Sequence, residues 1–75
     1  MTAEEAIRIL ERELATDKEI GMSEAYLITP ECFAAMIEKA RRGEYASEGT
    51  VLADYILENR KRYAEARRFK REKHF

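Results

Sequence analysis

"TPECFAAMIEKARRGEYASEGTVLADYI", residues 29–56, is the stretch that decides the fold of this chain. Thr29 and Pro30 open a helix, because a threonine side chain accepts a backbone N–H bond at a helix start and proline is preorganised for the first helical position. Gly43 ends the same helix, because glycine adopts the left-handed conformation that commonly follows a helix C-terminus. These signals predict a helix over residues 30–42.

One helix follows this stretch and another precedes it. Ser47 is a cap for a helix over residues 48–68, where apolar residues recur at helical spacing. Upstream, Thr2 and Glu5 form a Ser/Thr-x-x-Glu capping box, in which each side chain satisfies a free backbone N–H. The box and the apolar residues behind it predict a helix over residues 3–16.

The short apolar run before Pro30 is too short for a helix of its own. Over residues 23–29, Tyr26 and Ile28 alternate with their neighbours, which is compatible with a short strand. Apolar runs of this length do not fix their own period, so a linker is the other interpretation. We therefore expect a mostly α-helical fold with three helices and one short strand before Pro30; the alternative is a plain three-helix bundle.

The apolar stripes of the three helices predict the core. Residues at spacings of three and four share one face of a helix, and that face turns to the interior of a small domain. The residues expected to be buried are Ile7, Leu10, Leu14, Phe33, Met36, Ile37, Leu52, Tyr55 and Ile56. We also expect Cys32 to be a buried small hydrophobe, as is common for cysteine.

The chain is expected to form one small domain. Its 75 residues approach the size at which a single core is barely sufficient, and Cys32 is the only cysteine, so no disulfide supports the fold. Small charged chains often complete their core by self-association, which favours a homodimer. Within the domain the sequence divides into an N-terminal helix (1–20), a central core (23–59) and a basic helical tail (60–75).

The start of the chain and its hydropathy point to a cytoplasmic protein. Residues 1–5 lack the basic start and apolar run of a signal peptide. The longest apolar runs are only a few residues, far shorter than a stretch that crosses a bilayer. A lone cysteine also fits a reducing compartment. We therefore expect a cytoplasmic location and no membrane partner.

Charge is divided unevenly along the chain. Residues 1–59 hold six Lys and Arg against thirteen Asp and Glu, whereas residues 60–75 hold eight against two. Such a basic tail favours an acidic partner, either nucleic acid or the acidic body of the protein itself. Cations that contact phosphates supply most of the sequence-independent affinity for nucleic acid. The tail residues expected to bind nucleic acid are Arg60, Lys61, Arg67, Arg68, Lys70 and Arg71.

Residue patterns that carry catalysis are scarce. His74 is the only histidine and has no partner at the spacing of a catalytic triad or a metal site. Adjacent carboxylates such as Glu4 and Glu5 diverge around a helix and cannot share a site. Gly43 and Gly49 do not form a glycine-rich phosphate loop. We expect no catalytic residues, no metal site and no cofactor, and therefore not an enzyme.

The central part of the chain resembles the ribbon-helix-helix family, in particular its ParD-type antitoxins. The resemblance covers residues 23–60 and rests on a strand end at Ile28, a Gly-x-Tyr-x-Ser turn at residues 43–47, and apolar Val51 and Ile56 in the helix that follows. It implies a dimer in which strands of two chains pair into an antiparallel ribbon that enters the major groove of double-stranded DNA.

The same resemblance assigns DNA contacts to two further residues. It places Ser47 at the start of the second family helix, where backbone amides would hold a phosphate. It places Leu27 on the outward face of the ribbon, where its side chain would make only apolar contacts, for instance to a thymine methyl group. The implied function is a small DNA-binding regulator or antitoxin-like protein, with phosphate contacts mainly from the basic C-terminal helix.

A second class of function stays open. Here residues 23–29 are only a linker, and the chain is a small helical protein–protein interaction module that binds a protein partner through its acidic body or its basic helix. The opening "TAEEAI" is similar to that of many small phage or mobile-element proteins. An inhibitor of a nucleic-acid-handling enzyme belongs to this class. Pairing of residues 23–29 into a ribbon separates the two classes.

Overall fold

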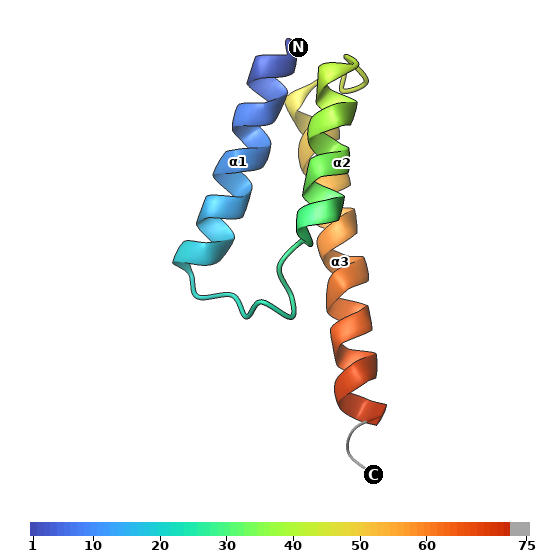
Figure 1. Ribbon diagram of the computed structural model, residues 1–75. Coiled ribbons are helices and arrows are strands. Elements are labelled where there is room, and N and C mark those ends of the chain that lie inside the picture. Colours follow the sequence, from blue (N-terminus) through green and yellow to red (C-terminus); the bar gives the residue numbers. More distant parts are fainter. Residues whose placement is uncertain (73–75) are drawn as a thin grey trace.

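Three helices make up the structure, a computed structural model that describes the backbone of residues 1–72 and the side chains of residues 1–68. They are α1 (Ala3–Glu19), α2 (Pro30–Arg41) and α3 (Glu48–Glu72). α2 runs antiparallel to both α1 and α3 (Figure 1). The prediction of a mostly helical fold with three helices is confirmed.

The helix ends lie where the local signals place them. The backbone N–H of Glu5 donates to Thr2 Oγ1 at 3.1 Å, and the N–H of Cys32 donates to Thr29 Oγ1 at 3.1 Å. Both threonines therefore cap a helix through an otherwise free amide. Gly43 has a φ of 71°, the left-handed conformation expected after the end of α2. Caps are short-range interactions, which is why the sequence predicts them.

α1 is longer than expected and does not stop near Thr16. The N–H of Ile20 donates to the carbonyl oxygen of Thr16 at 3.0 Å, so the helical bonding continues for a further turn. Gly21, with a φ of 77°, is the left-handed residue beyond that end. The polar residues between Thr16 and Gly21 face outward from the added turn, except Asp17, which is half-buried.

The core lies between the three helices. Leu10, Met36 and Tyr55 are buried, as predicted. The full buried cluster consists of Ala6, Ile9, Leu10, Ile28, Met36, Ala40, Tyr45, Val51 and Tyr55. The remaining residues of the predicted stripes, with Cys32, are half-buried against this cluster: Ile7, Leu14, Cys32, Phe33, Ile37 and Leu52.

Ile56 is the exception, because its prediction as a core residue is wrong. Its side chain is 50% exposed, whereas the neighbouring Tyr55 is 2% exposed. α3 turns the Tyr55 side toward the body and the Ile56 side outward. Both residues are apolar, so the sequence does not show which of the two faces the neighbouring helices cover.

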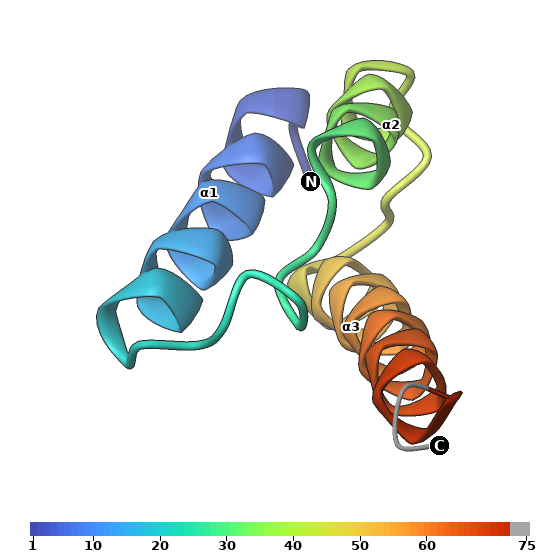
Figure 2. The same ribbon diagram turned by 60° about the horizontal axis from the view of Figure 1, so that its bottom comes forward.

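Residues 23–29 form a turn, and no strand is present among residues 1–72. The N–H groups of Tyr26 and Leu27 both donate to the carbonyl oxygen of Ser23, at 2.8 and 3.2 Å. The prediction of a short strand is therefore wrong for this chain, because local bonds occupy the amides that a strand would offer to a partner. The turn also buries Ile28, and it passes beside α3 before it reaches α2 (Figure 2).

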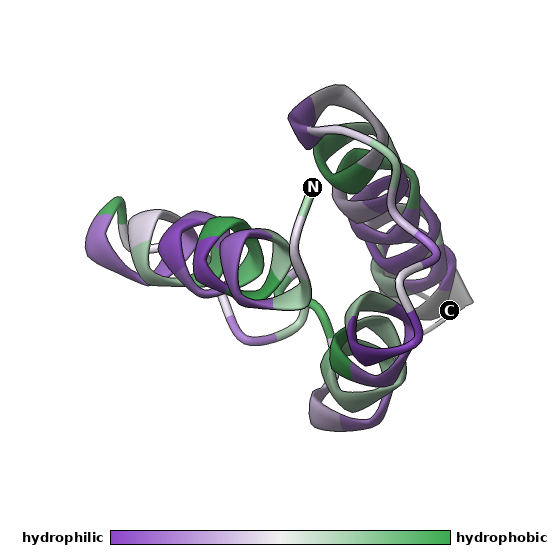
Figure 3. Ribbon diagram, turned by 90° about the horizontal axis from the view of Figure 1, so that it is seen from above, coloured by the Kyte–Doolittle hydropathy of each residue, from purple (hydrophilic) through white to green (hydrophobic). Residues whose placement is uncertain are grey.

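A polar contact fastens the lower end of α1 to α3. The hydroxyl of Tyr55 donates to Asp17 Oδ2 at 2.7 Å, and Asn59 Nδ2 donates to the same oxygen at 3.3 Å. At the upper end, Arg12 Nη2 lies 3.2 Å from Glu48 Oε1. Seen from above, the three helices stand apart at the corners of a triangle, and each carries both apolar and hydrophilic sides (Figure 3).

Candidate nucleic-acid interface

α3 extends beyond the packed body of the protein. Its first half carries the buried side chains Val51 and Tyr55, whereas its second half continues past the lower ends of α1 and α2 (Figure 1). Within residues 60–68, Arg62 and Ala66 are the least exposed side chains. Residues 60–68 are therefore mostly solvated, with one side turned toward the body.

The predicted tail cations share one side of this extension. Arg60, Lys61, Arg67 and Arg68 are all exposed and follow the spacing i, i+1, i+7 and i+8. Seven residues make about two turns of an α-helix, so the two pairs lie above one another on the same side. We call these four residues the basic face of α3. Arg62 points to roughly the opposite side of the helix.

Two of the cations in this region pair with a carboxylate of the same helix. Lys61 Nζ lies 3.2 Å from Glu58 Oε1, and Arg62 Nη1 lies 3.7 Å from Glu65 Oε2. Exposed pairs of this kind contribute little free energy, because water and salt screen them. Lys61 is thus free to exchange Glu58 for another anion at small cost.

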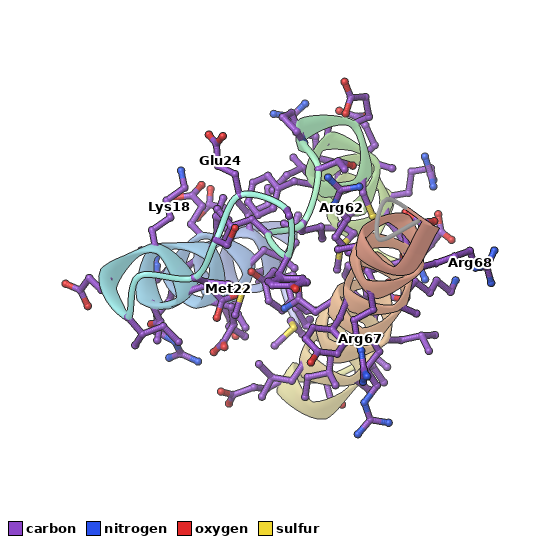
Figure 4. All side chains as sticks on the ribbon, turned by 90° about the horizontal axis from the view of Figure 1, so that it is seen from below. Lys18, Met22, Glu24, Arg62, Arg67 and Arg68 are labelled. Carbon is purple, nitrogen blue, oxygen red and sulfur yellow. The ribbon has the colours of Figure 1, made fainter. Side chains whose placement is uncertain are left out.

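The arginines of the basic face are open to solvent. Arg60 and Arg68 make no ion pair with any side chain of residues 1–68, and Arg67 lies over the ring of Tyr63 with 5.8 Å between guanidinium carbon and ring centroid. Arg67 and Arg68 point away from the body, while Arg62 turns toward the helices (Figure 4). These arginines are therefore available to an external anion.

Two of the predicted cations lie beyond what the structure describes in full. The backbone of Lys70 and Arg71 belongs to α3, but their side chains are outside the described residues. His74 lies outside them altogether.

Ser47 lies at the other end of α3. Its Oγ accepts the N–H of Thr50 at 3.4 Å, and its own N–H donates to Thr50 Oγ1 at 3.1 Å, so the two residues cap the helix reciprocally. Glu48, which follows directly, is exposed and pairs with Arg12. About 20 Å of helix separates Ser47 from the start of the basic face at Arg60. The structure does not bring the predicted phosphate site at Ser47 together with the tail cations.

Leu27 lies in a groove between α1 and α2 and is half-buried there. The groove has a volume of about 860 Å³, and its apolar walls include Leu14, Phe33 and Ile37. Because residues 23–29 form no strand, Leu27 does not lie on the outward face of a β-ribbon. The predicted contact of Leu27 with a base therefore lacks its structural basis. The groove could not be predicted from the sequence, because its walls come from three separate segments. The wide apolar side of residues 33–37 is the one sequence feature that indicates it.

Cys32 and Glu58 form a contact between α2 and α3. Cys32 Sγ donates to Glu58 Oε2 at 3.3 Å. Burial, together with this hydrogen bond and the negative charge of Glu58, raises the pKa of the Cys32 thiol to about 11. The thiolate is the nucleophilic form of cysteine, so this thiol is a poor nucleophile at neutral pH.

Tyr45, the tyrosine of the Gly-x-Tyr-x-Ser turn, connects this turn to the core. Its ring is buried, and its hydroxyl donates to Asp54 Oδ2 at 2.7 Å. Lys39 Nζ lies 3.3 Å from the same oxygen and 5.1 Å from the ring centroid of Tyr45. Burial and the Asp54 carboxylate raise the pKa of Tyr45. These contacts hold the connection between α2 and α3 against the body.

The part of the chain that the structure describes contains neither a candidate metal site nor a membrane-spanning helix. Within it, no group of three or more His, Cys, Asp or Glu side chains is placed to hold a metal ion. None of its helices combines the length and the apolarity that a bilayer crossing requires.

Comparisons with protein-family models, curated proteins and solved structures found no match to this chain. The resemblance to the ribbon-helix-helix family therefore stays a prediction.

Proposed function

We propose that this chain binds nucleic acid, with double-stranded DNA as its ligand, through the basic face of α3. One observation carries the proposal: four exposed cations share one side of a helix, and that helix extends beyond the body (Figure 1). Arg60 and Arg68, in particular, have no carboxylate partner among the described side chains. A cluster of exposed cations on one helix side is the electrostatic footprint of a phosphate-binding surface.

The dimensions of the basic face suit a phosphate backbone. From Arg60 to Arg68 the helix rises about 12 Å, and duplex DNA presents one negative charge per about 1.7 Å of its axis. Several phosphates therefore lie within reach of the four cations at once. Contacts to phosphates position a protein on DNA but carry no sequence information. The proposed binding is accordingly dominated by charge and strongly dependent on salt.

The acidic body orients this binding. Residues 1–59 hold seven more acidic than basic side chains, and their charge repels a phosphate backbone. The C-terminal half of α3 therefore faces the DNA, and the acidic body is directed away from it. The proposal keeps the DNA-binding function that the family resemblance implies, and it replaces the ribbon by α3 as the contacting element.

The test is the salt dependence of duplex binding, measured by fluorescence anisotropy with a labelled DNA duplex. Arg67→Gln with Arg68→Gln should weaken binding and reduce the slope of log K against log salt by about two units. The matched control, Arg8→Gln with Arg42→Gln, removes the same charge from the acidic body and should leave the slope nearly unchanged. Equal slopes in the two variants, or no binding by the unmodified protein at low salt, would overturn the proposal.

The groove between α1 and α2 supports a second candidate function, a protein–protein interaction module. Its apolar walls and its volume of about 860 Å³ suit an apolar side of a partner protein. In this function the basic face of α3 is only a solvated helix side. Absence of duplex binding at low salt favours this second candidate over nucleic-acid binding.

A further inference from the structure

A small pocket lies between the connection from α1 to α2 and the middle of α3. Its volume is about 290 Å³. We call it the tyrosine pocket, and it is lined by Met22, Tyr26, Ile56, Asn59, Arg60 and Tyr63. Ligand pockets in proteins usually measure about 300–1,000 Å³. The tyrosine pocket is at the small end of this range, so it has room for one small ring system and not for a longer segment.

Two aromatic rings form part of the wall of this pocket. The ring centroids of Tyr26 and Tyr63 are 4.9 Å apart, with 35° between the ring planes. Tyr63 is 49% exposed, and Ile56, on the same side of α3, is 50% exposed. The pocket is therefore open to solvent, although its lining is mainly aromatic and apolar. Such a wall suits the flat face of a planar ring.

Cations accompany this aromatic wall. Arg60 lines the pocket, and the guanidinium carbon of Arg67 lies 5.8 Å from the ring centroid of Tyr63. The described residues that line the pocket include no Asp or Glu. Arg60, Tyr63 and Arg67 follow the spacing i, i+3 and i+7, so they share one side of α3. The ligand that matches this site is a planar ring with negative charge attached beside it.

We propose that the tyrosine pocket binds an unpaired base of the DNA that the basic face of α3 holds. The base lies against the exposed ring of Tyr63, and Arg60 and Arg67 contact phosphates of the same strand. Proteins that bind single-stranded nucleic acid combine aromatic side chains, on which bases stack, with cations along the backbone. This inference rests on the proposed function, because the two arginines belong to both surfaces.

The shape of the site requires that the base be unpaired. In a duplex the bases stack on one another, and only their edges are accessible in the grooves. A base enters a pocket only when it leaves the stack, which costs least where the strand is already single. The expected ligand is therefore a single-stranded stretch next to a duplex. Stacking accepts the face of any base, so little sequence preference is expected.

The positions of the two arginines fit one nucleotide bound at Tyr63. Seven residues separate Arg60 from Arg67, which corresponds to a rise of about 10 Å along the helix. Tyr63 lies between them in the sequence and on the same side of α3. The two long side chains can therefore reach the phosphates on either side of a nucleotide whose base lies against the Tyr63 ring.

The test compares two labelled DNA duplexes by fluorescence anisotropy. Each has a central gap that leaves four nucleotides of one strand unpaired; these carry four adenines in one probe and four abasic sites in the other. The probes have equal charge, so their affinities should depend on salt in the same way. Loss of a stacked base lowers affinity by a factor of about 5–150. The unmodified protein should therefore bind the adenine probe at least about fivefold more tightly.

Variants of Tyr63 assign this preference to the pocket. Tyr63→Ala should remove the preference for the adenine probe and leave the salt dependence unchanged. Tyr63→Phe is the matched control, because it keeps the ring and should keep the preference. Far-UV circular dichroism checks the fold of each variant. Loss of helical signal in Tyr63→Ala shifts the decision to Tyr63→Leu, which offers no aromatic face and should also lose the preference.

Two outcomes overturn this inference and leave the basic face in place. One is equal affinity of the unmodified protein for the adenine and abasic probes. The other is a Tyr63→Ala or Tyr63→Leu variant that keeps both the helical spectrum and the preference. Absence of binding to these probes and to an ungapped duplex at low salt instead overturns the proposed function, and this inference with it. The two failures are therefore distinguishable.

Discussion

The hydrogen bond from Tyr55 to Asp17 makes a sharp prediction about stability. It joins residues 38 positions apart in the sequence, one on α3 and one near the end of α1. The ring of Tyr55 is only 2% exposed, so Tyr55→Phe removes the hydroxyl and leaves the packing of the ring in place. The perturbation therefore isolates one polar contact between two helices.

The magnitude follows from the surroundings of the carboxylate. Hydrogen bonds to charged groups contribute about 1.5–3 kcal/mol to stability. Asp17 is half-buried and keeps the weaker bond from Asn59 at 3.3 Å, so water and Asn59 satisfy part of the lost interaction. We expect Tyr55→Phe to lower the free energy of unfolding by about 1–2 kcal/mol, a loss that lies around and below the lower end of that range.

Urea denaturation followed by circular dichroism at pH 7, at matched chain concentrations, measures this loss. Tyr63→Phe is the control, because Tyr63 is 49% exposed, and it should change stability by less than about 0.5 kcal/mol. A double-mutant cycle with Asp17→Asn completes the experiment. If the two single losses add to within about 0.3–0.5 kcal/mol in the double variant, the two side chains do not interact and the reasoning is refuted.

Two further predictions concern the core and the buried thiol. Met36→Ala should cost about 2–5 kcal/mol because Met36 is 4% exposed, whereas Ile56→Ala should cost less than about 1 kcal/mol; comparable losses in urea melts would contradict the burial of these residues. Cys32, with its pKa raised to about 11 against an ordinary 9.0, should react with iodoacetamide at pH 8 far more slowly than a free thiol. Glu58→Gln removes a cause of that shift and should accelerate the reaction; an unchanged rate would show that Glu58 has no influence on the thiol.

Short-range signals account for the part of the fold that the sequence predicts well. Thr2, Thr29 and Gly43 act within one turn of a helix end, so the ends of α2 and the start of α1 follow from local chemistry. The charge asymmetry of the tail is likewise visible in the sequence. The sequence does not show which tail cations lie together on an exposed side of the helix, because that depends on how much of α3 the other two helices cover.

The choice of buried face is decided by packing between distant segments. α1 contacts both α2 and α3, so its buried side includes Ala6 and Ile9 besides the predicted stripe. Ile56 has an apolar side chain like Tyr55 but no helix lies over it. Sequence periodicity identifies apolar faces, yet a helix with apolar residues on more than one side leaves the choice between them to tertiary contacts.

The turn at residues 23–29 shows the same limit for local backbone structure. The backbone amides of a strand form hydrogen bonds with a partner strand, and the sequence of a seven-residue segment does not show whether such a partner is present. Here the carbonyl of Ser23 accepts two of those amides instead. The contacts of Cys32 with Glu58 and of Tyr45 with Asp54 likewise depend on how α2 and α3 are placed, which no local pattern records.

The extension of α3 beyond the body has a thermodynamic consequence for the cations that it carries. Initiating a helix is the costly step, and adding residues to an existing helix is cheap. The packed first half of α3 supplies that initiation, so the solvated half forms by propagation from an end that the core already holds. An isolated peptide of the last sixteen residues would lack this nucleus and would present its arginines at no fixed spacing. The regular spacing of these cations therefore depends on the hydrophobic core. Unfolding of the core should also unfold the helix that holds them in place.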